Sequence, residues 1–197
     1  MKFLKENSYD IVRLFINQIG ITIFSLILYF AAAQSEDDGT SLLISLLISV
    51  FATVFYMVLI YSASWDYGAK DKIRVDAGRM EAMHHKGLYL ALLANVPNFL
   101  LILLSLIGKG FYMLGLGAGF DTLFAVSNLI LRFCASSYLG ILRGVFASFA
   151  DAVDLYYLLQ TVGYLLLTLL PCLAAEVGYR LGFRNCRLFS DAGKGRK

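Results

Sequence analysis

Apolar residues fill four long stretches of the chain, and short polar blocks separate them. The four stretches are Leu14–Ala33, Ser41–Ala63, Gly87–Ile107 and Leu155–Val177. A helix of about 20 residues, rising ~1.5 Å per residue, crosses the ~30 Å hydrocarbon core of a bilayer. A cleaved signal sequence is the alternative for the first stretch, but that apolar run is too long for one. The pattern therefore predicts an all-α, polytopic integral membrane bundle with four transmembrane helices, forming one domain over residues 1–197.

The composition agrees with this class. Of the 197 residues, 59% are hydrophobic and 16% are charged, whereas about a quarter of the residues in a soluble domain are charged. The mean hydropathy is +0.70. We therefore expect the lipid bilayer to be the main surroundings of the chain.

A fifth segment, residues 108–154, allows more than one path. Residues 121–150 favour a single long helix with small residues at every fourth position, which lets helix backbones approach closely. These helix-packing residues are Ser136, Gly140, Gly144 and Ser148. The long helix lies along the membrane interface, crosses the membrane, or follows a re-entrant segment at Gly108–Phe120. We therefore expect four to six crossings.

The second predicted helix carries a matching ridge of small hydroxyl residues. Its members are Ser41, Ser45, Ser49 and Thr53. Two such ridges can pack together at short range, either within one chain or across a homo-oligomer. The alternative is that serine is simply tolerated in a membrane helix.

Basic residues predict the orientation, because loops rich in Lys and Arg stay on the cytoplasmic side. They concentrate before the first helix, in the loop 64–86 and in the tail 178–197. The loop after the first helix, Gln34–Thr40, has three acidic residues and no basic one. We therefore expect a protein of the cell membrane with both termini and the loop 64–86 in the cytoplasm.

The loop 64–86 holds charges of both signs at spacings that suit ion pairs on a short solvated helix. The alternative is a docking surface for a cytoplasmic partner or for anionic lipid head groups. The loop also holds both histidines, His84 and His85. Only one acidic residue at helical spacing, Glu81, could join them, so we predict no metal site.

Polar residues inside the predicted helices are candidate ligand-binding residues, because polar groups at membrane depth need partners. Those of the first and third helices are Asn17, Gln18, Asn95, Pro97 and Asn98. Pro97 cannot donate a backbone hydrogen bond, so we expect a kinked or partly unwound helix there. These residues form either a polar binding pocket or structural contacts between helices.

Two arginines of the fifth segment, Arg132 and Arg143, complete the ligand-binding candidates. A charged group at membrane depth is costly unless it is paired, which makes both arginines candidates for a functional role. The alternative is that their side chains reach lipid head groups at the interface.

The sequence contains no pattern of a hydrolase nucleophile, a zinc protease or a nucleotide-binding loop. Its three cysteines do not have the spacing of a zinc site. We therefore expect no catalytic residues, no cofactor and no metal. We also expect no nucleic-acid binding, because topology explains the basic tail.

Two function classes follow. The first is a transport-related component, such as a carrier, a channel or a membrane-embedded substrate-binding subunit, that works with a larger partner. The second is a non-transport accessory or structural subunit that docks a cytoplasmic partner through the loop 64–86. An enzyme ranks behind both.

Overall fold

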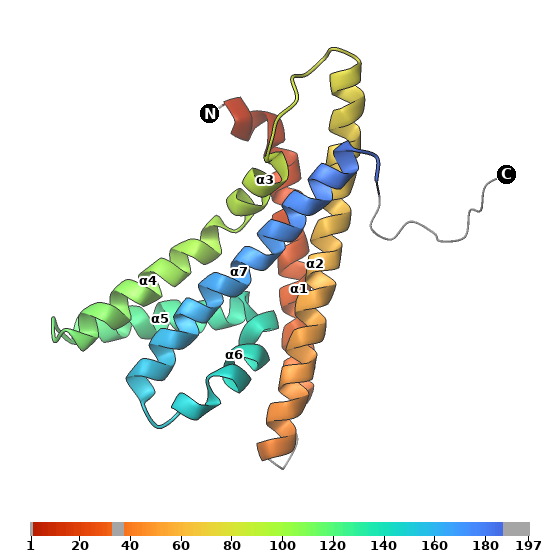
Figure 1. Ribbon diagram of the computed structural model, residues 1–197. Helices are drawn as coiled ribbons and strands as arrows, with labels where there is room; N and C mark the ends of the chain where they lie inside the picture. The colour runs from red at the N-terminus through yellow and green to blue at the C-terminus, as the bar shows by residue number, and fades with distance from the viewer. Residues whose placement is uncertain (1, 33–37, 187–197) are drawn as a thin grey trace.

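The computed structural model describes residues 2–32 and 38–186, and all regular structure in these residues is helical (Figure 1). The elements are α1 (Lys2–Ala32), α2 (Asp38–Asp76), α3 (Lys86–Ala94), α4 (Val96–Met113), α5 (Ala118–Cys134), η1 (Ser136–Tyr138), α6 (Leu139–Val145), η2 (Ala147–Phe149) and α7 (Val153–Phe183). The prediction of an all-α fold is confirmed.

Four of these helices are long and apolar enough to cross a membrane, namely α1, α2, α4 and α7. They correspond to the four apolar stretches of the sequence, so the prediction of four such helices is confirmed. The third stretch is divided at Asn95 into α3 and α4. Pro97 lies in the first turn of α4, where a missing N–H leaves no helical hydrogen bond unmade.

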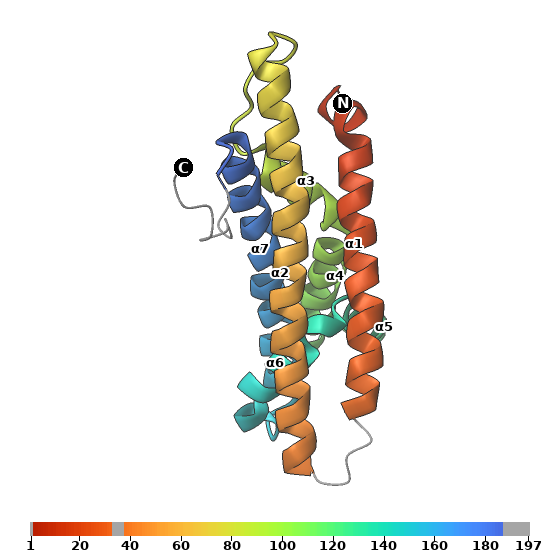
Figure 2. The same cartoon turned by 90° about the vertical axis from the view of Figure 1, so that its right-hand side faces the viewer.

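The long helices run between two ends of the molecule. α1 and α2 lie side by side and antiparallel, and the C-terminal half of α7 packs along α2 (Figures 1 and 2). The start of α1, the connection between α2 and α3, and the end of α7 share one end of the bundle. The start of α2 and the start of α7 lie toward the other end.

The contact between α2 and α7 requires glycine. A Cβ atom at Gly178 would overlap the carbonyl oxygen of Tyr61, and one at Gly182 would overlap that of Trp65. The two glycines are four residues apart, which is the small-xxx-small spacing of close helix pairs in membranes. Sequence analysis did not single out this pair, although its spacing is visible in the sequence.

The prediction of one straight helix over residues 121–150 is wrong. The chain bends by 84° between α5 and the following short helices, where Ala135 separates Cys134 from Ser136. α5, α6 and the start of α7 lie in the half of the molecule away from the start of α1 (Figure 1). Residues 108–120 are the end of α4, a turn and the start of α5, so they form no separate re-entrant crossing.

Side chains of α1 and α2 explain how the chain bends there without a proline or glycine. The Thr22 hydroxyl donates to the carbonyl of Cys134 over 2.8 Å, and the Ser136 hydroxyl donates to the carbonyl of Thr22 over 3.0 Å. The Thr53 hydroxyl donates to the carbonyl of Ser137 over 3.3 Å. A backbone group that loses its helical partner in an apolar medium needs another one, and the hydroxyls of Thr22 and Thr53 supply it to the carbonyls of Cys134 and Ser137.

The small-residue ridges meet within the chain. Ser45 and Ser49 of α2 are buried and face Gly140, whose backbone N–H donates to the Ser49 hydroxyl over 2.7 Å. Gly144 lies less tightly against Leu46. Ser148 does not join this contact, because α6 ends at Val145 and the four-residue repeat is lost in η2, where Ser148 is exposed.

Most of the segment 64–86 is helix, as its charge spacing suggested, but this helix is the continuous end of α2 rather than a separate short one. α2 continues to Asp76, so only residues 77–85 connect α2 to α3. The helical part is not simply solvated either, because Ser64, Tyr67 and Asp71 are buried. The tail 187–197 lies outside the described residues.

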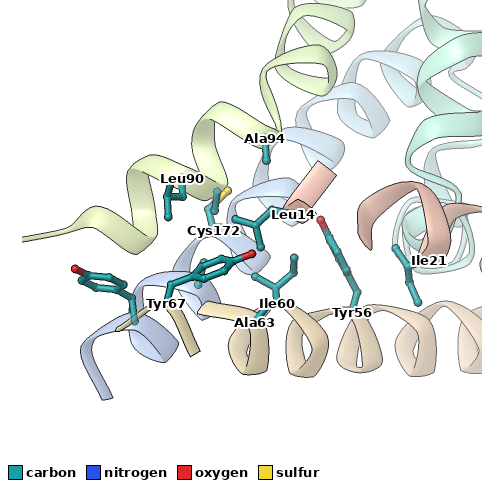
Figure 3. Packing of buried hydrophobic residues seen from close by; sticks show 12 residues of the cluster. Leu14, Ile21, Tyr56, Ile60, Ala63, Tyr67, Leu90, Ala94 and Cys172 are labelled. Atoms are coloured by element: carbon teal, nitrogen blue, oxygen red, sulfur yellow. The ribbon is translucent and has the colours of Figure 1, made fainter. Parts of the chain in front are cut away.

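The larger hydrophobic core lies between α1, α2, α3 and α7. Leu14, Tyr56, Leu90 and Cys172 reach it from these four helices (Figure 3). A second cluster, around Ile102, joins α4, α5, α6 and α7. The two clusters fix α7 against both halves of the bundle.

Candidate functional site

A cavity of about 370 Å³ lies between α4, α5 and the first turns of α7. We call it the α4–α5–α7 cavity. Its polar lining residues are Lys109, Tyr112, Asp121, Asn128, Arg132, Asp154 and Tyr157. The volume is in the range of pockets for small molecules, about 300–1,000 Å³.

α4 and α5 form a tight antiparallel pair that builds one side of the cavity. A Cβ atom at Gly108 would lie 2.7 Å from the backbone nitrogen of Phe124, so glycine allows the two helices to touch. The hydroxyls of Ser105 and Ser127 are 2.9 Å apart across the same contact. Asp121, Phe124, Asn128 and Arg132 follow one another at three- and four-residue steps, so they share one face of α5.

Lys109 is buried in the cavity wall. Its Nζ lies 2.6 Å from Oδ1 of Asp154 and 5.0–5.7 Å from the ring centroids of Tyr112, Phe124 and Tyr157. A lysine ammonium within ~6 Å of a ring centroid is attracted by the face of the ring. The lysine charge is therefore compensated within the protein, whereas its partner Asp154 stays more than half exposed.

The guanidinium of Arg132 is not compensated in the same way. Its Nη2 donates to Oε1 of Gln160 over 2.9 Å, and its Cζ lies 5.3 Å from the ring centroid of Tyr157. Its Nε is buried without a partner, and so is Nδ2 of Asn128 one turn earlier. Within residues 2–32 and 38–186, Arg132 forms no ion pair with a carboxylate.

Two unpartnered hydrogen-bond donors beside one cavity indicate which kind of ligand group the cavity can bind. A buried donor without an acceptor costs about 1–3 kcal/mol, and a guanidinium suits a carboxylate or phosphate because its planar N–H groups match two oxygens. The Arg132 end of the cavity can therefore accept an anionic group of a ligand. The face of Tyr157 beside it can cover an apolar part.

Asn95 and Asn98 are both buried at the α3–α4 break. Nδ2 of Asn95 donates to the carbonyl of Ala91 over 3.0 Å, and Nδ2 of Asn98 donates to Oδ1 of Asn95 over 3.2 Å. Nδ2 of Asn95 also lies 3.8 Å from Sγ of Cys172. These amides already join α3, α4 and α7, which is the arrangement of structural contacts between helices.

The other sequence candidates are not brought to one place. Gln18 is buried on the core face of α1, with its Oε1 unpartnered, whereas Asn17 is only half-buried. Pro97 and Arg143 are exposed. Arg143 lies on α6, outside both the α4–α5–α7 cavity and the Asn95 contacts.

A buried ion pair lies at the opposite end of the bundle, and sequence analysis missed it. Nζ of Lys86 is 2.7 Å from Oδ2 of Asp71, and both side chains are at most 5% exposed. The hydroxyl of Tyr179 donates to the same Asp71 oxygen over 3.0 Å. The cluster joins α2, α3 and α7. Its partners are distant in sequence, so helical spacing could not have revealed it.

Glu176 lies at the same end of the bundle as the Asp71–Lys86 pair. Its Oε2 accepts a hydrogen bond from the backbone N–H of Leu88, in the first turn of α3, over 3.0 Å. Its Oε1 lies 2.5 Å from Nε of Arg180 and 2.9 Å from Nδ1 of His85. A carboxylate at a helix N-terminus satisfies a free N–H and the helix dipole. Glu176 therefore acts as a cap for α3.

In the described residues, no group of three or more His, Cys, Asp or Glu side chains could hold a metal ion. Comparison with known proteins adds no relative: no family model, no curated protein and no solved structure matches the chain. The functional argument therefore rests on the geometry of the chain itself.

Proposed function

We propose that the chain is a membrane-embedded component of a transport system, which binds a small solute with an anionic group in the α4–α5–α7 cavity. The observation that carries this proposal is the unpaired Arg132 guanidinium beside the unpartnered Asn128 amide. The anionic group binds to these donors, and an apolar part of the solute lies against Tyr157. The positive-inside pattern of the sequence supports a location of this cavity toward the outer side of the cell membrane.

A partner is part of the proposal. The chain carries no nucleotide-binding loop that could drive uptake. The amides of Asn95 and Asn98 are engaged in hydrogen bonds within the core, and they do not line an open polar path. A binding subunit that delivers its solute to a larger partner fits these features better than a carrier or channel that acts alone.

Binding can be tested without knowing the natural solute. We expect benzoate to raise the melting temperature of the purified protein in detergent, because it offers a carboxylate to Arg132 and a ring to Tyr157. Benzamide has the same shape without the charge and should do much less. Arg132→Gln should abolish the benzoate effect, whereas Arg143→Gln, outside the cavity, should leave it intact. An equal effect of benzoate and benzamide would contradict an anion site.

The second candidate function is an accessory subunit that docks an acidic cytoplasmic partner. It is favoured by a second cavity, of about 540 Å³, at the end of the bundle that holds residues 77–85. Its lysine, histidine and arginine lining residues are Lys72, His84, His85, Arg180 and Arg184. If this is the function, Arg184→Glu should abolish chemical cross-linking of the chain to its partner in membranes. Arg132→Gln should leave this cross-linking unchanged.

A further inference from the structure

An apolar groove of about 580 Å³ follows the outer face of the α3–α4 break. Its lining residues are Phe3, Met83, Tyr89, Leu92, Leu93, Val96 and Phe99. From Tyr89 to Phe99 the chain covers about 15 Å at the helical rise, which is about the depth of one leaflet of the hydrocarbon core. The groove therefore has the length to hold part of one lipid acyl chain.

A polar cavity of about 790 Å³ adjoins this groove. Phe3 and Met83 line both spaces, so the two form one continuous surface. The charged residues of the polar cavity are Glu6, Arg74, Arg79, Glu81 and Lys86. A polar cavity that opens into an apolar groove fits an amphiphile rather than a water-soluble solute.

The turn after α2 brings two arginines together in this cavity. Gly78 has a left-handed backbone (φ 67°), its N–H donates to the carbonyl of Val75, and the N–H of Arg79 donates to the carbonyl of Arg74 over 3.0 Å. This is a Schellman motif, which places the residue after the glycine beside the last helical turn. The sequence around Gly78 thus sets Arg74 and Arg79 side by side.

Both arginines can bind a further anion. Lys86 already forms an ion pair with Asp71. Arg74 lies 3.5 Å from an Asp71 side chain that Lys86 and Tyr179 already engage, and the Arg74 side chain is 60% exposed. Arg79 is exposed and makes no ion pair within the part of the chain that the structure describes. Paired guanidinium groups suit the oxygens of a phosphate.

A glutamate in the wall restricts the head group. A purely anionic head group would face the carboxylate of Glu81 as well as the arginines. A phosphate that carries a primary ammonium nearby complements both signs, because the ammonium can donate hydrogen bonds to a carboxylate. A choline group carries the same charge but has no N–H to donate.

We propose that this surface binds one phospholipid of the phosphatidylethanolamine type. Its phosphate binds to Arg74 and Arg79, its ammonium faces Glu81, and one acyl chain lies in the groove along Leu92, Val96 and Phe99. The lipid thereby covers the outer face of the α3–α4 break.

The test compares phosphatidylethanolamine, phosphatidylcholine and phosphatidylglycerol with identical acyl chains, added to the delipidated protein in detergent. We expect phosphatidylethanolamine to raise the melting temperature most and native mass spectrometry to show one retained copy. Arg79→Gln should raise the half-saturating concentration of this lipid about tenfold, which corresponds to ~1.4 kcal/mol, because the variant loses a charge-assisted contact with the phosphate. Arg184→Gln, at the other cavity of this end, is the matched control and should leave that concentration unchanged.

Further comparisons test the acyl-chain part and the head-group part of the proposal separately. Leu92→Trp, which fills the groove, should weaken binding while the protein still melts cooperatively. Soluble phosphoethanolamine should not stabilise the protein, because it has no acyl chain. Equal stabilisation by phosphatidylcholine or phosphatidylglycerol would overturn the head-group assignment. Equal stabilisation by phosphoethanolamine, or an unchanged affinity of Arg79→Gln, would overturn the lipid site.

Discussion

The hydroxyl of Ser49 in α2 accepts a hydrogen bond from the backbone N–H of Gly140, 2.7 Å away in α6. This bond lies just beyond the bend, at a point where a side chain on residue 140 would overlap the carbonyl oxygen of Ser45. The bent path of α5 and α6 thus depends on the absence of one side chain.

Gly140→Ala should therefore lower the melting temperature in detergent strongly. Overpacking a helix contact typically costs about 1–3 kcal/mol, and backbone atoms cannot move aside as a flexible side chain can. Gly144→Ala is the matched control, because its Cβ would meet only the end of the Leu46 side chain, at 3.2 Å. Equal melting temperatures for the two variants would contradict the close contact at Gly140.

The Asp71–Lys86 pair predicts an asymmetry between single and double substitution. Lys86→Met leaves a buried carboxylate without its nearest cation, and breaking a buried pair in this way costs about 3–5 kcal/mol. The double variant Asp71→Asn and Lys86→Met should recover part of the loss. Lys72→Met removes the exposed pair with Asp76, so its melting temperature should fall much less. If the stability losses of the two single variants simply add up in the double variant, the two side chains are not energetically coupled.

Asn95→Leu should reduce stability without removing anion binding. Its amide bonds the Ala91 carbonyl and the Asn98 side chain, and loss of such bonds in a buried site costs about 1–3 kcal/mol. The benzoate effect should persist, since the α4–α5–α7 cavity does not include Asn95. A folded variant of normal stability that has lost solute binding or uptake would instead place the ligand at the α3–α4 break.

The predicted orientation can be checked by labelling single cysteines with a reagent that does not cross membranes. In a variant without Cys134, Cys172 and Cys186, we expect labelling from outside at position 37 and none at 2, 72 or 194, because basic segments stay in the cytoplasm. Positions 37 and 194 lie outside the described residues. Labelling of position 194 from outside would contradict the shared location of the two termini.

The apolar pattern was sufficient to predict four helices of membrane-crossing length. α1, α2 and α7 each follow one continuous apolar stretch, whereas the third stretch is divided at Asn95 and only α4 keeps that length. The bend at Ala135 was not predictable in that way. The hydroxyls that allow it belong to Thr22 of α1 and Thr53 of α2. Both residues are distant in sequence from the bend. A local search for proline or glycine finds no trace of such a bend.

The candidate site was predictable only in part for the same reason. Arg132 stood out because a charge within an apolar segment needs an explanation. Lys109 and Asp154 did not, since each lies near a predicted loop and their pairing needs the contact of α4 with α7. The ring of Tyr157 that both Lys109 and Arg132 approach was one aromatic residue among many.

The Glu176 cap has a consequence for the order in which the molecule can be completed. A ribosome makes α3 long before α7, so the N–H of Leu88 has no carboxylate to accept its hydrogen bond when α3 first leaves the exit tunnel. The N–H of Leu88 can make this hydrogen bond only after residue 176 has been synthesised. The first turn of α3 therefore reaches its final contacts after α7 has been made, although it is encoded before the midpoint of the sequence.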